Sequence, residues 1–261
     1  MLRVYLNGDS QTYGSDLPVL HTGSLLHTES YAEDAVCSYA VHLVHRLGGE
    51  VIANPAVGGA SNERILRTTN QMLDDCERNN EPYPDFMVIG WSEWSRYDWF
   101  HNGKLRTAGA MQDGFSIEEI LYNPIHSKRW EWQQRELGRN MFGPGQINYQ
   151  YNQMFNLHCR LEYLKIPHLF LNAHAGFYDD YGFIHRGNTL AVGLVDIGWD
   201  NCFWNVLERE DASFTSWAGK RGYESVTGWH YSAEAHHDFG KVMYDYIQEH
   251  DLLNMYKTDN E

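Results

Sequence analysis

Short apolar runs alternate with amphipathic segments along the chain. The runs at 3–6, 51–53, 86–89 and 168–171 have the length and composition of buried strands, and turn residues follow them. Apolar residues recur at helical spacing over about 31–47, 65–76, 147–164 and 233–250. Strands that alternate with helices predict a three-layer α/β/α fold around a mostly parallel sheet.

Serine residues mark the expected beginnings of two helices. Ser30 and Glu33 have the spacing of a capping box ahead of 31–47, and Ser61 can cap the helix after the second strand. The pattern loses its rhythm between 91 and 142, where tryptophan is frequent. We therefore expect an insertion after the third strand, with helix at about 116–122 and 128–138. Since no linker is visible, we expect a single domain over 1–261.

Composition narrows the class of protein. The 261 residues are 43% hydrophobic and 14% aromatic, which suits a globular chain with a substantial core. No apolar run is long enough to span a bilayer, so we expect no membrane partner. The formal net charge of −15 would repel polyphosphates, which argues against a nucleic-acid partner.

The cysteines and the N-terminus indicate a reducing compartment. Cys37, Cys76, Cys159 and Cys202 lie far apart with no C-x-x-C pair, so we expect four free thiols. No export signal is recognisable in the first residues, and we expect a cytoplasmic protein or a component of a particle.

Gly8-Asp9-Ser10 is the first candidate for chemistry. It directly follows the first predicted strand, so the serine is expected at the carboxyl edge of the sheet, where open α/β sheets bind ligands. The same residue types are also ordinary turn and capping residues. The tripeptide therefore needs support from other segments.

Two other segments supply that support. The stretch 54–62, Asn-Pro-Ala-Val-Gly-Gly-Ala-Ser-Asn, follows the second strand, and His230 precedes the last helix. With Gly8-Asp9-Ser10, they resemble the SGNH or GDSL hydrolase superfamily. That resemblance implies a flavodoxin-like α/β/α fold. The order of elements is also similar to GDSL-type proteins encoded by bacteriophages.

The resemblance also implies roles for particular residues. Ser10 would be the nucleophile and His230 its general base, within hydrogen-bond range of each other. The backbone N–H groups of Gly59 and Ser10 would hold the oxyanion. Such a hydrolase needs no cofactor.

Two positions depart from the superfamily pattern. The asparagine expected after the third strand is absent, and Ser92 stands nearby, so Ser92 or Asn62 would have to replace that oxyanion donor. The aspartate expected three residues before the histidine is replaced by Thr227. Glu224, or a carbonyl within 222–228, would then orient His230.

Two further candidates have competing interpretations. Trp91 follows Gly90 at the sheet edge and could form a wall of a substrate site or simply be buried. His230, His236 and His237 suggest a metal, but no carboxylate stands at the spacing of a zinc motif, so we expect no metal site there.

The resulting hypothesis is a serine-dependent ester hydrolase. Its partner would be an acylated small molecule or an acetylated polysaccharide, with the aromatic insertion beside the site. The alternative is a catalytically impaired binding or structural protein that keeps the fold, such as a phage virion component in contact with other virion proteins. The missing asparagine and aspartate favour that alternative.

Overall fold

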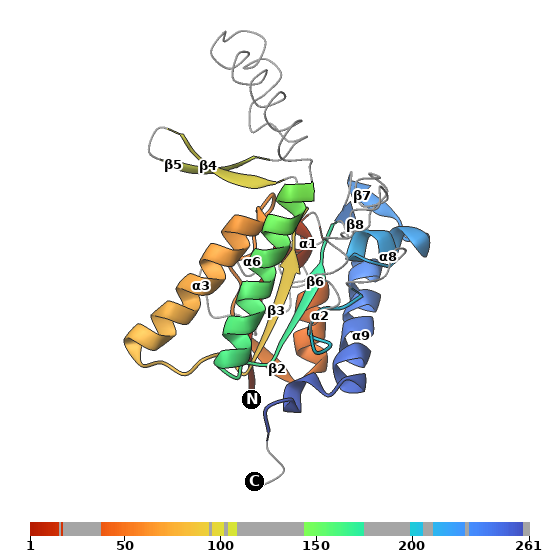
Figure 1. Ribbon diagram of the computed structural model, residues 1–261. Coiled ribbons are helices and arrows are strands. Elements are labelled where there is room, and N and C mark those ends of the chain that lie inside the picture. The colour runs from red at the N-terminus through yellow and green to blue at the C-terminus, as the bar shows by residue number, and fades with distance from the viewer. Residues whose placement is uncertain are drawn as a thin grey trace.

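The computed structural model describes residues 1–15, 17, 38–93, 96–101, 104–108, 144–174, 199–205, 211–227 and 230–257. Within these ranges four parallel strands form the central sheet in the order β2-β1-β3-β6 (Figure 1). Their bounds are Leu2–Asn7 for β1, Gly49–Ala53 for β2, Phe86–Trp91 for β3 and His168–Asn172 for β6. The α/β fold and the parallel sheet expected from the pattern are confirmed.

Helices cover both faces of this sheet. On one face lie α3 (Asn62–Asn79) and α6 (Pro144–Tyr163), which pack against alternate strand residues such as Met87 and Ile89. On the other face α2 (Tyr39–Arg46) and α9 (Ala233–Glu249) pack against the intervening residues, such as Phe86 and Val88. Because successive strand side chains point to opposite faces, both cores form from the same strands.

Shorter elements complete the described fold. They are α1 (Ser10–Tyr13), β4 (Tyr97–His101), β5 (Lys104–Ala108), α8 (Phe214–Lys220), β7 (Ser225–Thr227), β8 (His230–Tyr231) and η3 (Leu252–Asn254). The β4–β5 pair is an antiparallel hairpin within the range of the expected insertion, 91–142, and the sequence pattern did not predict it. The helices expected at 116–122 and 128–138 lie outside the described residues.

One helix begins later than expected. Ser38, not Ser30, is the N-cap of α2: its backbone is extended, and its side chain accepts a hydrogen bond from the N–H of Val41. Ser61 caps α3 as expected, by accepting from the N–H of Arg64. Ser30 and residues 31–37 lie outside the described ranges.

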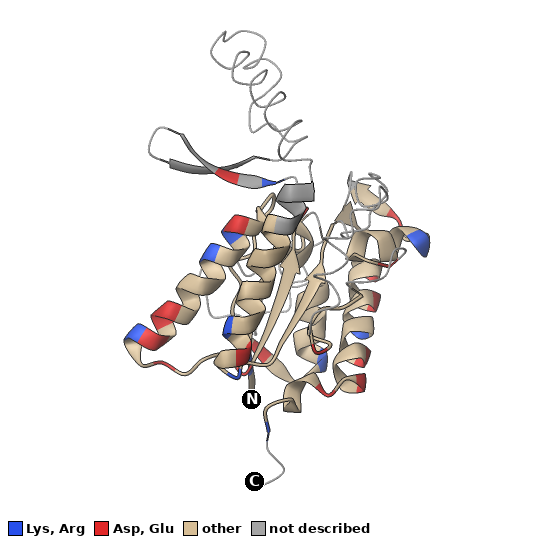
Figure 2. Cartoon of the chain, viewed as in Figure 1, with Lys and Arg blue, Asp and Glu red and all other residues tan. Residues whose placement is uncertain are grey.

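The distribution of charged residues matches the layered fold. Figure 2 shows them mainly on the helices, and β3 and β6 carry no Lys, Arg, Asp or Glu. This is the pattern of parallel strands covered on both faces.

Cys76, Cys159 and Cys202 are free thiols, as expected, and Cys37 is outside the described residues. Among the described helices, none has both the length and the apolar character needed to cross a membrane.

The helix α1, which begins at Ser10, packs against the ends of β1 and β3. No space is left there for a side chain at Gly8 or Gly90. A Cβ added at Gly90 would lie 2.2 Å from the Thr12 hydroxyl oxygen and 2.4 Å from that of Tyr39. A Cβ at Gly8 would lie 2.1 Å from the same Thr12 oxygen and 2.8 Å from the Gly90 carbonyl oxygen. Glycine at both positions therefore lets α1 lie directly on the edge of β1 and β3.

We predict that Gly90→Ala lowers the free energy of unfolding by about 1–3 kcal/mol, the usual cost of overpacking a buried site. Denaturant unfolding followed by circular dichroism measures the change. Gly58→Ala is the matched control, because a Cβ there meets only the Ser15 hydroxyl oxygen at 3.4 Å. Equal stability of the Gly90 variant and the wild type would contradict the close packing.

Candidate active site

The polar residues of the candidate site follow three parallel strands at one edge. The chain runs from β1 to β2 on one side and then to β3 and β6 on the other, so β1 and β3 flank the point where the strand order reverses. Ligands of open α/β sheets bind at this point, beyond the carboxyl ends of the strands. Asp9 and Ser10 follow β1, Arg96 lies five residues beyond β3, and His174 lies two residues beyond β6.

Asp9 is the centre of the cluster. It is the N-cap of α1, and its Oδ1 atom accepts a hydrogen bond from the N–H of Gln11. Its Oδ2 atom lies 3.3 Å from Arg96 Nη1 and 3.1 Å from His174 Nε2. The residue has no solvent exposure. A buried carboxylate is stable only with such partners. The contacts of Asp9 therefore link the segments that follow β1, β3 and β6.

His174 is the imidazole beside Ser10. Its Nε2 atom lies 3.4 Å from Ser10 Oγ. The side chain of Ser213, the N-cap of α8, donates to the carbonyl of His174 at 3.0 Å, and the Thr215 hydroxyl donates to the same oxygen. Burial lowers the pKa of His174, the Asp9 carboxylate opposes that shift, and the Arg96 cation adds to it. The imidazole is therefore neutral near pH 7 and can accept a proton.

Arg96 neutralises the site. Its guanidinium is almost completely buried, donates to Ser92 Oγ at 2.9 Å and lies 3.4 Å from His174 Nε2 through Nη2. A guanidinium has only hydrogen-bond donors, so the Arg96 contact uses a lone pair on Nε2, whereas a hydrogen on Nε2 would donate to Asp9 Oδ2 at 3.1 Å. The tautomer with the lone pair on Nε2 is the one that could accept the proton of Ser10.

His230 is a neighbour of this cluster. Its ring centroid lies 6.5 Å from that of His174, and it begins β8 beside β7. The hydrogen bond expected between Ser10 and His230 is replaced in the structure by the contact of Ser10 with His174. Glu224 is exposed, and its carbonyl accepts from the N–H of Ser232. The orienting role of Glu224 toward His230 stays a prediction.

The expected oxyanion donors occupy different positions. Asn62 is buried and braces Ser92: its Oδ1 accepts from the Ser92 N–H, and its Nδ2 donates to the Ser92 carbonyl and to Gln150 Oε1. Both amide hydrogens are in use, so Asn62 is not available as an oxyanion donor in this structure. Gly59 lies in the turn after β2 with φ of +73°, a left-handed conformation that suits glycine.

Trp91 is part of the core and does not face a substrate. It is 1% exposed and packs edge-on against Phe170, with ring centroids 5.3 Å apart. Of the two interpretations of Trp91, the structure shows burial and not a substrate wall, because Trp91 lies on the same strand face as Met87 and Ile89, which α3 and α6 cover.

The two histidines of α9 have separate structural contacts. His236 is buried, and its Nδ1 accepts from the N–H of Tyr39, which joins α9 to the beginning of α2. His237 is exposed and contacts Arg46 and Asp238.

Sequence reasoning missed His174 and Arg96. A signal for His174 was available, because it follows the predicted fourth strand and must lie at the same sheet edge as Ser10. Arg96 had no such signal, since it stands in an irregular segment where the periodicity fails.

Comparisons with known proteins give a family and a set of distant structures. Residues 27–182 match the model described as "Family of unknown function (DUF6071)". No curated protein matches the chain.

Three solved structures are similar at low identity. The psychrotrophic esterase EstA from Pseudoalteromonas sp. is 11% identical over 95% of this chain and 98% of that one, with a TM-score of 0.45. A carbohydrate esterase family 2 enzyme with a carbohydrate binding domain from Corynascus thermopiles (Myceliophthora fergusii) is 13% identical over 95% and 66%, with a TM-score of 0.45. A protein described as a GDSL-like lipase from Parabacteroides merdae is 12% identical over 96% of each chain, also with a TM-score of 0.45.

We predict that Arg96→Met lowers the free energy of unfolding by about 3–5 kcal/mol, because it leaves the Asp9 carboxylate buried without its cation. The double variant Asp9→Asn/Arg96→Met should be more stable than Arg96→Met alone, since asparagine keeps the helix cap and removes the charge. Urea unfolding of the wild type, Asp9→Asn, Arg96→Met and the double variant measures the coupling.

The control is Arg78→Met, which breaks an exposed ion pair with Asp75 and should change the stability by less than about 1 kcal/mol. Equal losses in the two arginine variants would show that Asp9 does not need Arg96.

Proposed function

The chain belongs to the family of unknown function DUF6071, and we propose that it is a serine-dependent hydrolase of acyl esters in which Ser10 is the nucleophile and His174 the general base. The observation that carries the proposal is the 3.4 Å separation of Ser10 Oγ and His174 Nε2 at the edge where the strand order reverses. A serine and its base are commonly this far apart before substrate binds.

Asp9 would stabilise the proton once it has moved from Ser10 to His174. With the lone pair on Nε2, His174 can take the proton of Ser10 as the hydroxyl oxygen attacks the ester carbonyl. The resulting Nε2–H then has an anionic acceptor in Asp9 Oδ2, 3.1 Å away. The proton would then pass to the departing alcohol, and water would cleave the acyl-enzyme to release the acid and free Ser10. Asp9 would stabilise the imidazolium from the side of the reacting nitrogen. In a Ser-His-Asp triad, by contrast, the carboxylate binds the other ring nitrogen.

The oxyanion would be held by backbone N–H groups of Gly59 and Ser10, as the superfamily resemblance implies. Arg96 adds a buried positive charge. Its Nη2 atom and Ser10 Oγ both contact Nε2 of His174. We propose that this charge compensates for the asparagine missing after β3. His230, 6.5 Å from His174 between ring centroids, would line the approach to the serine.

The finer substrate class is an acetylated polysaccharide or a similar acyl ester. Its support is the resemblance of Gly8-Asp9-Ser10 and its partner segments to SGNH or GDSL hydrolases. Acetate release from acetylated xylan tests this class separately from general esterase activity.

A binding or structural protein is the second candidate function. Two observations favour it: Ser10 is 3% exposed, and the charge of Asp9 is already paired with Arg96. If no acyl ester is cleaved, this function replaces hydrolysis.

We predict that the wild type hydrolyses p-nitrophenyl acetate and that Ser10→Ala abolishes this activity. His174→Ala should lower kcat/KM by roughly 100- to 10,000-fold, the contribution of a general base. His230→Ala should cost much less, and Ser15→Ala is the matched serine control. A larger loss in His230→Ala than in His174→Ala would return the role of base to His230.

The pH profile gives an independent prediction. Since burial lowers the pKa of His174 from 6.5, its neutral form persists on acidification, and kcat/KM should begin to fall only below pH 6.5. Stopped-time assays from pH 4 to 8, monitored at a wavelength insensitive to phenol ionisation, measure this limb. An acid limb above pH 6.5 would contradict a buried histidine as the base.

A further inference from the structure

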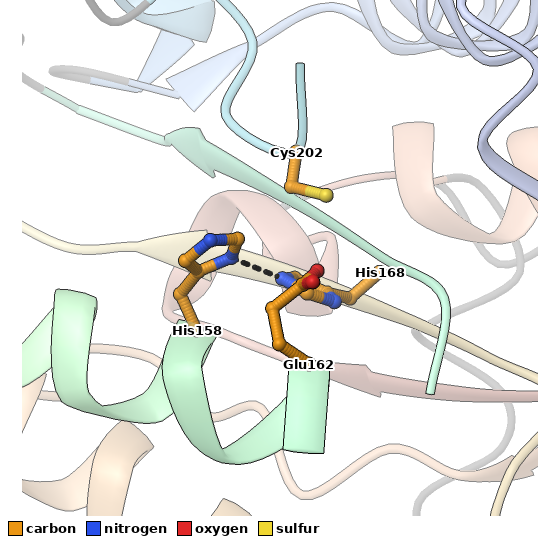
Figure 3. Close-up of side chains that lie close together, drawn as sticks. All are labelled: His158, Glu162, His168 and Cys202. Atoms are coloured by element: carbon orange, nitrogen blue, oxygen red, sulfur yellow. Dashed lines mark hydrogen bonds between the residues drawn. The ribbon is translucent and has the colours of Figure 1, made fainter. Parts of the chain in front are cut away.

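Four metal-ligand side chains meet at the opposite end of β6 from Ser10. They are His158 and Glu162 of α6, His168 at the beginning of β6, and Cys202 from the segment beside that strand (Figure 3). Their ligand atoms all lie within 4.8 Å of one another. The length of β6, about 13 Å, separates His168 from the end of the strand that leads to His174.

The fold explains how these distant residues come together. His158 and Glu162 are four residues apart, so they project from the same side of α6. Cys202 is carried to the strand by backbone pairing: the Phe170 N–H donates to the Cys202 carbonyl at 2.6 Å, and the Trp204 N–H donates to the Phe170 carbonyl at 2.8 Å. Helix, strand and segment therefore each contribute donors.

The histidine orientations suit a metal site. His168 Nδ1 lies 2.9 Å from the Ile166 carbonyl, which can only accept, so Nδ1 carries the hydrogen and the lone pair of Nε2 faces the cluster. That lone pair accepts a hydrogen bond from His158 Nδ1, so metal binding would require His158 to carry its hydrogen on Nε2. A carbonyl that holds the second nitrogen in this way is the usual outer partner of a metal-binding histidine. His158 Nδ1 lies 2.8 Å from His168 Nε2. A bound ion would increase this separation to about 3.3 Å, the distance between two ligands of a tetrahedral zinc.

The surroundings also fit a structural ion. His168 and Cys202 have no solvent exposure, and His158 is 3% exposed. The ring of Trp199 packs against His158 with centroids 5.2 Å apart, which gives the cluster an aromatic cover. Tyr256 donates a hydrogen bond to Glu162 Oε1 and so connects the C-terminal segment to the same group.

We propose that His158, Glu162, His168 and Cys202 bind a divalent transition-metal ion of the zinc type that joins α6, β6 and the Cys202 segment. Two imidazole nitrogens, one carboxylate oxygen and one thiolate are each zinc ligands, and four protein ligands fill a tetrahedral site. The expectation of no metal was drawn from the histidines near the C-terminus. The ligands of this site are spread over 158–202, where no short motif reveals them.

Metal content of the purified full-length chain tests the proposal. After incubation with zinc and gel filtration, the wild type should retain stoichiometric zinc by mass spectrometry. Cys202→Ser should lower zinc affinity by at least roughly 10- to 100-fold, the loss produced when even an outer partner of a ligand is removed. Cys159→Ser is the matched control, because Cys159 is an exposed cysteine of α6, the helix that carries His158 and Glu162. It should bind zinc like the wild type.

Cobalt gives a readout that does not depend on the folding of a variant. Wild type loaded with Co²⁺ should show the near-ultraviolet charge-transfer band of a thiolate–cobalt bond and the visible bands of a tetrahedral site. Glu162→Gln should keep the thiolate band and bind cobalt more weakly. Absence of retained zinc and of the thiolate band in the wild type would overturn the proposal, as would a thiolate band that Cys159→Ser removes and Cys202→Ser keeps. Ser10→Ala should bind both metals normally, so this result is separate from the hydrolase test.

Discussion

Asp9 is a carboxylate with no solvent exposure, and it lies at the edge of the sheet where the parallel strands end. Neighbouring groups compensate for its negative charge. The Gln11 N–H, the Arg96 guanidinium and the His174 imidazole each contact one of its oxygens. These partners belong to segments that follow β1, β3 and β6. The need to pair one buried charge thus places the serine after Asp9 beside an imidazole and a guanidinium.

The sheet makes this convergence possible. All four central strands are parallel, so their carboxyl ends share one edge, and α1 can approach that edge closely because Gly8 and Gly90 have no side chain. The opposite end of β6 has a different chemistry, with two imidazoles, a carboxylate and a thiol enclosed by aromatic rings. In our account, one end of the strand supports ester hydrolysis and the other holds a structural ion.

Much of the fold follows from local patterns, whereas the site depends on contacts that no local pattern carries. The four strands, the cap of α3 by Ser61 and the apolar face of α9 were predictable from periodicity and capping residues. The beginning of α2 was not, because Ser30 and Ser38 are both plausible caps by residue type. Strict alternation along β3 would have placed Trp91 with Met87 and Ile89 in the core. Gly8-Asp9-Ser10 pointed to the right sheet edge, but Arg96 joins it only through tertiary packing.

The proposed hydrolysis depends on Ser10 being a nucleophile that His174 activates. Labelling with a fluorophosphonate, which bonds covalently to an activated serine, tests it most directly when the modified peptide is mapped by mass spectrometry. Our account predicts a label on Ser10 that disappears in His174→Ala and persists in His230→Ala and Ser15→Ala. An unlabelled Ser10 in the folded wild type, or a label that survives in His174→Ala, would contradict it.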